Sequence, residues 1–520
     1  MGPRGVFIRN SFFKRNYIAS NIKWNQMKQI FFYLILITLM VKNTSCEVSH
    51  QPGDLEQAIC CKNSEKAIQI LKRGINVNEY NNSTSFLHLA LSHRLENVAL
   101  ILIAKGADVN VRDSIGYSPV HLAAKYGLHN VIDVLIKKDA NLNFIDDAGY
   151  TPLNYAIISG NQSIIKQLLI HGAVTFHRGL PTMKDGPFVD YTEDGLLSYY
   201  LVHDSLMSTT TMQAKLFPHG TKQFKGWIAD SLTYTIQDIS KTEWVVNTNQ
   251  PIFVLGDIHG QYDRMVQNLK ENNVIGPDLK WTFGKGHLVF VGDIFDRGPK
   301  VTEALWFIYN LEQEAEKAGG KVHLILGNHE LLVLENDLRY IHRKYEKLSE
   351  HTGLNHALLF HPNSVLGEWI RSKTTFLKIN DILFVHAGVS EKLLRGKLST
   401  EQINNLTADY LNGGENPHNE DDLDLVLGSF GPFWYRGYFK ERSKYPLIKE
   451  AELDRIMNEL DVKTIIVGHT ENDKIKGYFN GKVINVNIPL ADESVPNQAL
   501  LIEKGKFYHY TEGTDEQIIK

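Results

Sequence analysis

The chain has 520 residues, of which 43% are hydrophobic and 22% charged, and it contains 3 cysteines. This is the composition of an ordinary globular protein, which excludes wholesale disorder, a collagen-like fibre and a disulfide scaffold with several bridges. The formal net charge is −4, from 55 basic and 59 acidic residues, so the sequence predicts no nucleic-acid binding. At about 100–200 residues per domain, the length predicts two to four domains.

The first 46 residues carry seven basic residues and no acidic ones. Without them, 48 basic residues remain against 59 acidic ones, a net charge of −11 for residues 47–520. An apolar run extends from Ile30 to Val41. Its twelve residues would span about 18 Å as a helix, less than the roughly 30 Å of a membrane's hydrocarbon core. Residues 1–46 are therefore interpreted as a signal peptide region, with Met27 as an alternative start, and the predicted location is periplasmic or secreted.

Two alternatives would keep this segment on a membrane. Cys46 is a candidate lipid-anchor cysteine, although Asn43 stands three positions before it, where such sites carry leucine. An uncleaved amphipathic anchor is the second alternative. No other stretch is long and apolar enough to span a membrane.

Cys60 and Cys61 are adjacent, and because a bridge between neighbours is strained, both are predicted to be buried thiols.

A pattern with a period of 33 residues follows. Residues 85–90, 118–123 and 151–156 align at this step, and each unit combines a turn, a short helix and a second apolar helix. The pattern resembles ankyrin repeats, about four of them within residues 47–178, with degenerate first and last units. The resemblance implies an all-α array with a concave face for an unidentified protein partner; bracing of the neighbouring domain is the alternative. His88 and His121 are expected to bond the turns rather than a metal.

The period is absent from residues 179–250, which are interpreted as a linker and β-rich entry segment. Residues 188–191 and 196–202 have strand-like composition and flank a turn at Thr192–Gly195, which predicts a hairpin. The Ser/Thr/Gln-rich residues 205–225 are interpreted as a loop.

Five short apolar runs from residue 251 onward each end abruptly in Gly, Asp, Asn or His. They are residues 252–255, 288–291, 322–326, 382–385 and 465–467. Continuous apolar runs of this length are typical of strands buried on both faces. Helical spacing over Tyr262–Asn273, Thr302–Lys317 and Glu330–Lys347 makes this an α/β domain, in which sites form at the carboxyl ends of strands.

The side chains at these strand ends suit metal ions, because Asp, His and Asn are hard or borderline ligands for Mn, Fe or Zn. Two ions about 3.5–4 Å apart can bridge a water, lower its pKa and clamp a phosphoryl group, provided that an aspartate lies between them. One such string could be a turn after a strand, but five in order favour a dinuclear site.

The five strings read GDIHG, GDIFDRG, GNHE, HAG and a late GH, at residues 256–260, 292–298, 327–330, 386–388 and 468–469. With them, residues 251–510 resemble the phosphoprotein phosphatase branch of the calcineurin-like metallophosphoesterases, most closely the bacterial Shewanella-like phosphatases. The resemblance implies a four-layer α/β/β/α sandwich, followed by a C-terminal tail over residues 511–520.

The resemblance also implies roles for individual residues. Six side chains are the expected ligands of two divalent ions (Mn, Fe or Zn), with Asp293 between the ions: Asp257, His259, Asp293, Asn328, His386 and His469. His329, paired with Asp296, is the expected general acid for the leaving oxygen. Arg297 and Arg436 are expected to bind the phosphate.

The predicted function is hydrolysis of phosphomonoesters on phosphoprotein substrates (Ser/Thr or Tyr) through direct attack by a metal-bridging hydroxide, with the ankyrin repeats binding protein. The HAG string replaces HGG, and no SAPNY string occurs near the C-terminus, unlike in the main eukaryotic enzymes. Diadenosine tetraphosphate hydrolases share the LGNH and HAG strings but lack the Asp before Arg-Gly, so dinucleoside polyphosphate hydrolysis is the alternative. A third hypothesis is an ankyrin interaction protein whose phosphatase domain only binds.

Overall fold

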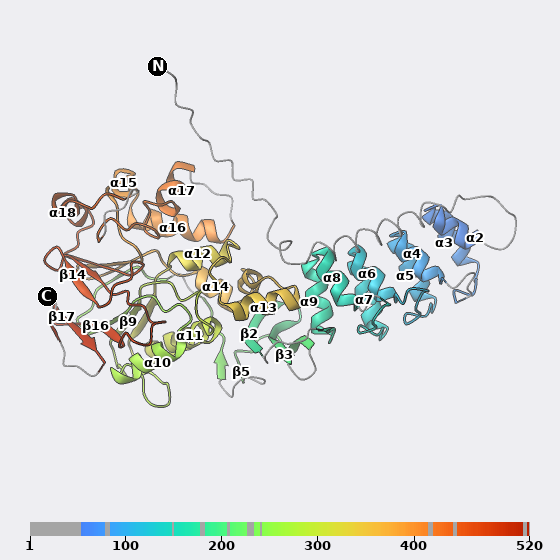
Figure 1. Cartoon of the computed structure of the whole chain (residues 1–520), viewed down its shortest axis with the longest axis horizontal. Helices are drawn as coiled ribbons and strands as arrows, with labels where there is room; N and C mark the ends of the chain where they lie inside the picture. Colours follow the sequence, from blue (N-terminus) through green and yellow to red (C-terminus); the bar gives the residue numbers. More distant parts are fainter. Residues whose placement is uncertain are drawn as a thin grey trace, which may run out of the picture. The chain divides into compact units, whose positions relative to one another are not determined.

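The computed structural model describes residues 54–520 apart from short gaps (Figure 1). The gaps are residues 79–83, 148–149, 177–182, 205–208, 226–232, 240–241, 414–419, 440–444, 513–516 and 519–520. The predicted signal peptide region, including Met27 and Cys46, lies outside the described residues. Among the residues that are described, no helix has the length and apolar character needed to cross a membrane.

The chain divides into two compact units, with the boundary between Asp113 and Ser114. The first unit contains the helix pairs α2 (Asp54–Cys60) with α3 (Ser64–Lys72) and α4 (Phe86–Ser92) with α5 (Glu96–Ala104). Asn78 joins two successive turns of this unit, because its Nδ2 donates to Gly106 O at 2.9 Å and its Oδ1 accepts from Asp108 N at 2.8 Å.

Two cysteines of the first unit depart from the prediction. Cys60 and Cys61 are both exposed, so their interpretation as buried thiols is wrong. The physical reason is their position: Cys60 is the last residue of α2, and Cys61 lies in the turn that follows, outside the apolar stripe that carries Leu55 and Ile59.

The second unit begins with two more helix pairs of the repeat: α6 (Pro119–Tyr126), α7 (His129–Lys137), α8 (Pro152–Ser159) and α9 (Gln162–Ile170). Ser118 and Thr151 precede the first helix of each pair as N-caps, with proline in the first turn. His121 binds the turns: its Nδ1 accepts from Ser118 N at 3.0 Å, and its Nε2 lies 3.2 Å from Tyr150 O. The expectation that this histidine bonds the turn backbone is confirmed.

A four-stranded antiparallel sheet follows the array, in the order β1-β4-β3-β2. Its strands are β1 (Thr175–Phe176), β2 (Met183–Thr192), β3 (Gly195–Asp204) and β4 (Thr209–Phe217). The β2–β3 hairpin turns where Thr192 pairs with Gly195. The interpretation of residues 205–225 as a loop is wrong, because Thr209–Phe217 pair with β3 along its length. The threonines that made this stretch appear polar are also β-branched and favour strands.

Two mixed six-stranded sheets form the rest of the second unit, and a two-stranded ribbon, β5 (Gln223–Lys225) with β6 (Thr233–Thr235), precedes them. The first sheet has the order β10-β9-β8-β16-β17-β18: Lys321–Leu324, His287–Phe290, Ile252–Leu255, Gln498–Glu503, Lys506–Thr511 and Gln517–Ile518. The second has the order β14-β15-β13-β12-β11-β7: Lys476–Tyr478, Val483–Asn485, Thr464–Val467, Ile382–Val385, Phe376–Ile379 and Val245–Val246. The five predicted strands are therefore β8, β9, β10, β12 and β13, and four of these are buried along their whole length.

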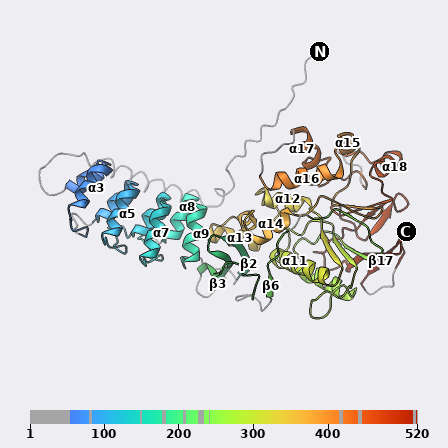
Figure 2. The ribbon, with the colours of Figure 1, turned by 180° about the vertical axis from the view of Figure 1, so that it is seen from behind.

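Helices lie on opposite sides of these sheets (Figures 1 and 2). On one side are α10 (Tyr262–Glu271) and α11 (Val301–Lys317), and on the other α15 (Glu391–Arg395), α16 (Thr400–Leu411), α17 (Glu420–Leu427) and α18 (Glu450–Glu459). The described residues thus form ankyrin-type helix pairs followed by a domain of mixed α/β sheets, while the four-layer order stays a prediction.

The single helix predicted over Glu330–Lys347 is wrong. The chain forms α12 (Asn328–Leu334) and α13 (Arg343–Thr352), followed by the 3₁₀ helix η1 (His356–Phe360) and α14 (Val365–Arg371). Asn336, with φ +65°, interrupts the helix in a left-handed conformation. The loop between α12 and α13 carries Tyr340 to the candidate metal centre, which is described below.

Candidate metal centre

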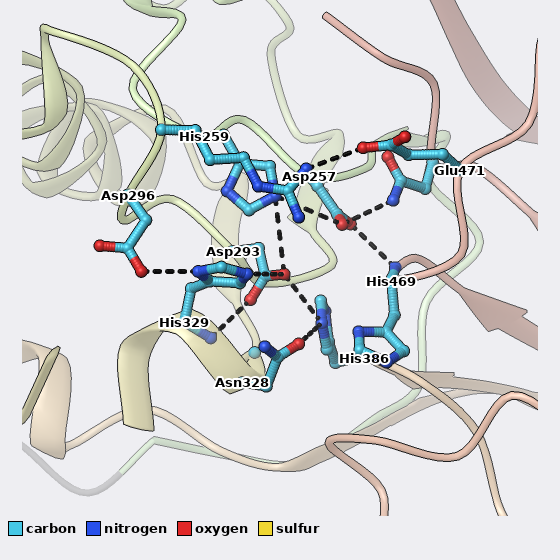
Figure 3. Close-up of polar contacts among 12 residues, drawn as sticks. Asp257, His259, Asp293, Asp296, Asn328, His329, His386, His469 and Glu471 are labelled. Carbon is cyan, nitrogen blue, oxygen red and sulfur yellow. Dashed lines mark hydrogen bonds and ion pairs between the residues drawn. The ribbon is translucent and has the colours of Figure 1, made fainter. Parts of the chain in front are cut away.

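The predicted metal ligands come from five segments and meet at the strand ends (Figure 3). Asp257 and His259 follow β8, Asp293 follows β9, Asn328 begins α12 after β10, His386 follows β12 and His469 follows β13. All six side chains are buried. The structure therefore brings the whole predicted set together.

The backbone at this centre is unusual. Five non-glycine residues have φ between +48° and +70°: His259, Asp293, Asp296, Arg297 and His469. A left-handed conformation at such residues costs about 1–3 kcal/mol each and persists only where the surroundings impose it. Asp293 O accepts hydrogen bonds from Ile258 N at 3.0 Å and His259 N at 2.8 Å, which ties the first two strand ends together. Gly292, with φ +89°, permits a further close approach, since a Cβ there would lie 2.7 Å from His386 Nδ1.

Asp293 occupies the middle of the cluster. Its Oδ2 lies 3.1 Å from His386 Nε2, 3.8 Å from His259 Nε2 and 4.0 Å from His329 Nε2. It is shared by two groups of candidate ligand atoms whose members lie within 4.8 Å of one another, one with His259 and His329 and the other with His386 and His469. A carboxylate shared in this way can bridge two ions.

The residues fit divalent metal ions. The Nε2 atoms of His259 and His469 are buried and have no hydrogen-bond partner among the described residues. The Nδ1 atoms of His259 and His386 lie 2.9 Å from Phe295 O and 2.7 Å from Val291 O, respectively, so that each Nε2 faces the cluster. A histidine held by its other ring nitrogen is typical of metal ligands, and an ion would satisfy nitrogens that are otherwise costly to bury.

Burial and mutual charge set the protonation of the centre. Burial, and then the charge of Asp293, raise the pKa of Asp257 to about 7. Burial alone would raise the pKa of Asp293, but His386 and His329 outweigh it and lower that pKa well below its usual range. Burial would lower the pKa of His386, but Asp293 raises it to about 9. Burial lowers the pKa of His259 to about 3, which leaves its Nε2 lone pair available for a metal.

His329 and Asp296 form a buried pair next to the cluster. His329 Nδ1 lies 2.6 Å from Asp296 Oδ2, and its Nε2 points toward Asp293 (Figure 3). Burial opposes the charged imidazole, but Asp293 and Asp296 prevail and raise the pKa of His329. This arrangement holds the ring in one orientation and favours a proton on Nε2, as a general acid requires.

Both predicted phosphate-binding arginines reach the loop that carries His469. Arg297 Nη1 lies 2.7 Å from Glu471 Oε1, and its side chain is 45% exposed. Arg436 Nη1 donates to His469 O at 2.9 Å and lies 3.3 Å from Thr470 Oγ1. The two guanidinium groups thus converge on one edge of the metal cluster from different segments.

Glu330 is a residue of the centre to which the sequence assigned no role. Its carboxylate is fully buried and accepts backbone N–H bonds from Gly327 at 2.7 Å, Asp293 at 2.8 Å and Ile294 at 2.7 Å. It therefore holds the second strand end against the third. The signal for it was present, because it is the last residue of the GNHE string.

Asn487 and Asn485 give no comparable signal. Asn487 Nδ2 donates to Asp257 Oδ2 at 2.6 Å, and Asn485 Nδ2 donates to Thr470 O at 2.7 Å; both asparagines are buried. They come from the end of β15, which follows the last predicted motif. Asn487 orients a predicted metal ligand, and Asn485 orients the turn that carries another.

Comparison with known proteins agrees with this geometry. Residues 250–472 match the family model "Calcineurin-like phosphoesterase", and residues 112–177 match a model of ankyrin repeats in three copies. The crystal structure of a cold-active protein-tyrosine phosphatase from a psychrophilic Shewanella species is 32% identical, with a TM-score of 0.58. The similarity covers 65% of this chain and 100% of that one. The chain belongs to the calcineurin-like phosphoesterases.

Curated relatives of this calcineurin-like phosphoesterase carry related names. "Shewanella-like protein phosphatase 1" of Plasmodium berghei (strain Anka) is 27% identical over 51% of this chain and 79% of its own length. "Shewanella-like protein phosphatase 2" of Arabidopsis thaliana is 24% identical over 49% of this chain and 76% of its own length.

Proposed function

We propose that this calcineurin-like phosphoesterase is a metal-dependent phosphatase that hydrolyses phosphomonoesters on proteins with the help of two divalent ions (Mn, Fe or Zn). The observation that carries the proposal is the convergence of five ligand-type side chains around a sixth, Asp293, beside the His329–Asp296 pair. The names of the relatives and of the Shewanella structure, all phosphatases, support the same activity.

Each group has a part in such a reaction. When bound, the ions supply Lewis-acid charge for the phosphoryl oxygens and an activated water for in-line attack. Arg297 and Arg436 bind phosphoryl oxygens, for which a planar guanidinium is suited. His329 donates the Nε2 proton to the leaving oxygen, and Asp296 keeps the imidazole charged and oriented.

Phosphotyrosine is a substrate that the surroundings of His329 support. The exposed ring of Tyr340 lies 5.3 Å from the His329 ring, measured between ring centroids, in an edge-on arrangement. An aromatic leaving group next to His329 could pack against this ring. The similar Shewanella protein is named a protein-tyrosine phosphatase, which points the same way.

A peptide panel tests the proposal. Purified protein with added Mn²⁺ is expected to dephosphorylate phosphotyrosine, phosphoserine or phosphothreonine peptides and to lose this activity on chelation. Metal analysis of the purified protein gives the number and identity of the ions. Faster hydrolysis of a bis-nucleoside tetraphosphate than of every peptide would favour the alternative, and no hydrolysis of either would leave only a binding role.

We also propose that the ankyrin repeats bind a protein partner and that the chain is exported. Truncation to residues 114–520 removes the first compact unit as a whole. Unchanged turnover on a peptide together with lost partner capture would support a targeting role. N-terminal sequencing of the protein from cell fractions tests export and the choice of start.

A further inference from the structure

One end of α13 holds the loop that carries Asp296 and Arg297. Pro299 follows this loop, and its carbonyl accepts hydrogen bonds from Tyr345 Oη at 2.9 Å and Lys344 Nζ at 3.0 Å. The Tyr345 hydroxyl also accepts from Val301 N at 2.8 Å. The first turn of α13 therefore fixes the backbone immediately after the phosphate-binding arginine.

A third contact comes from the segment just before α13. Arg297 N donates to Tyr340 O at 2.9 Å. Asp296 and Arg297 have φ values of +70° and +59°, a conformation that non-glycine residues keep only under restraint. The contacts of Tyr340, Lys344 and Tyr345 supply restraint at this point of the loop.

Lys344 and Tyr345, which together clamp the Pro299 carbonyl, are themselves held in place. Lys344 is 14% exposed and lies 3.0 Å from Asp185 Oδ1 and 3.8 Å from Glu303 Oε1. Burial alone would lower the pKa of Lys344, but these carboxylates outweigh it and raise that pKa, so the ammonium stays charged. The ring of buried Tyr345 stacks on His356, with 4.4 Å between ring centroids. Because Asp185 belongs to β2, the clamp also connects to the sheet that follows the array.

The other end of α13 packs against the last repeat of the array. Gly353 caps the C-terminus of the helix, and a Cβ there would lie 2.6 Å from Ile157 Cγ1 and 3.1 Å from Ile165 Cδ1, atoms of α8 and α9. Thr175 Oγ1, in β1 directly after the same repeat, donates to His351 O at 3.0 Å. One ten-residue helix thus contacts the repeat at one end and the catalytic loop at the other.

We propose that Tyr345 and Lys344 are positioning residues for Arg297 and Asp296, and that α13 makes the last ankyrin repeat part of the scaffold of the phosphate site. The inference rests on the proposed function, since it takes Arg297 as a phosphate ligand. It adds that affinity for a phosphomonoester, or for inorganic phosphate, depends on residues that touch neither the phosphate nor the metals.

Tyr345→Phe in the full chain tests the first half. It removes one hydroxyl and keeps the ring stacked on His356. The inhibition constant of inorganic phosphate and the KM for a phosphopeptide are expected to rise about fivefold to tenfold, the effect of one or two lost hydrogen bonds, with little change in kcat or metal content. Tyr309→Phe is the matched control, because its buried hydroxyl accepts from Gln237 N at 2.8 Å, away from the loop.

Phosphate affinity of Tyr345→Phe equal to that of Tyr309→Phe would overturn the inference, even if both variants melt at lower temperature. Calorimetric titration of the Mn²⁺-loaded protein with inorganic phosphate gives the same answer without turnover. Absence of hydrolysis by the wild type would thus contradict the proposed function, whereas an unchanged phosphate affinity in Tyr345→Phe would contradict the clamp.

Gly353→Ala tests the second half. The added Cβ must displace Ile157, and φ +67° strains any alanine. Gly413→Ala is the control, since Gly413 has the same φ of +67° and, among the described residues, no atom beyond its chain neighbours lies within 4 Å of where its Cβ would stand. Phosphate affinity is expected to fall about threefold in Gly353→Ala relative to Gly413→Ala, as the last turn of α13 moves. Equal affinities in the two variants would show that the repeat does not support the site.

Discussion

Asp293 and Arg297 belong to one loop, yet they lie in opposite surroundings. The Asp293 side chain is 2% exposed and is surrounded by histidines, whereas that of Arg297 is 45% exposed and pairs with the half-exposed Glu471. Charges at the buried centre around Asp293 interact with little screening. The interaction of Arg297 with Glu471, at the exposed rim of the site, is weakened by water and salt. Substitutions at the centre should therefore abolish function, and those at the rim should adjust affinity.

Asp293→Asn should have the largest effect. It keeps the shape of the side chain but removes the charge shared by both groups of candidate ligands. Turnover on a phosphopeptide is expected to fall by roughly 10³-fold, the scale seen when a central electrostatic group is lost, and metal content should fall with it. Asp421→Asn, at an exposed carboxylate, should behave as wild type. Full activity of Asp293→Asn would exclude the proposed mechanism.

His329→Gln should have the next largest effect, and one that depends on the leaving group. Loss of a general acid costs about 10²–10⁴-fold when the leaving oxygen is basic. The rate on a phosphoserine peptide should therefore fall much more than the rate on p-nitrophenyl phosphate, whose leaving group needs little help. Equal losses on both substrates would assign His329 to metal binding, as its distance of 4.0 Å from Asp293 also permits.

These two predictions concern residues that could be predicted from the sequence, because a short local pattern marks them. Each predicted ligand follows a short apolar strand, so the strand pattern and the family resemblance that its polar strings carry predicted the six residues and the His329–Asp296 pair that the structure brings together. Five predicted strands fall within two residues of β8, β9, β10, β12 and β13 for the same reason.

What supports these residues was not predictable, because the partners are distant in the chain. Asn487 bonds Asp257 across 230 positions, and Tyr345 bonds Val301 across 44, with no local pattern to mark either. The break between α12 and α13 has a similar origin, since the loop that interrupts the helix is fixed by its contact with Arg297. Strand β4 was missed because its threonines leave no continuous apolar run, and its pairing with β3 cannot be deduced from the local sequence.

Asn487→Ala tests the buried centre in another way, because it removes a hydrogen-bond partner of Asp257 and none of the predicted ligands. Its amide donates to Asp257 at 2.6 Å, and loss of such an orienting partner typically costs 10–100-fold in metal affinity. Titration of the metal-free protein with Mn²⁺, followed by the rise in thermal midpoint, should show weaker binding by about this factor. Asn412→Ala, on the exposed end of α16, is the control. Unchanged affinity would mean that Asp257 is held by its other contact, His469 N at 3.1 Å.

Glu471→Gln addresses the rim and should have the smallest effect. In the structure, Arg297 Nη1 pairs with Glu471 Oε1, and a phosphate oxygen would use the same N–H donor. Neutralising Glu471 is therefore expected to lower the inhibition constant of inorganic phosphate, by about twofold to fivefold at low ionic strength, since exposed pairs contribute about 0–1 kcal/mol.

The salt dependence of this effect separates the rim from the centre. The difference between Glu471→Gln and wild type should shrink at roughly 0.5 M salt, where charges at the surface are screened within a few ångströms. Glu503→Gln, which removes a comparable exposed charge next to Lys504, should leave phosphate affinity unchanged. Weaker phosphate binding by Glu471→Gln would instead show that the carboxylate orients Arg297 for the phosphate, and the rim would then be preorganised like the centre.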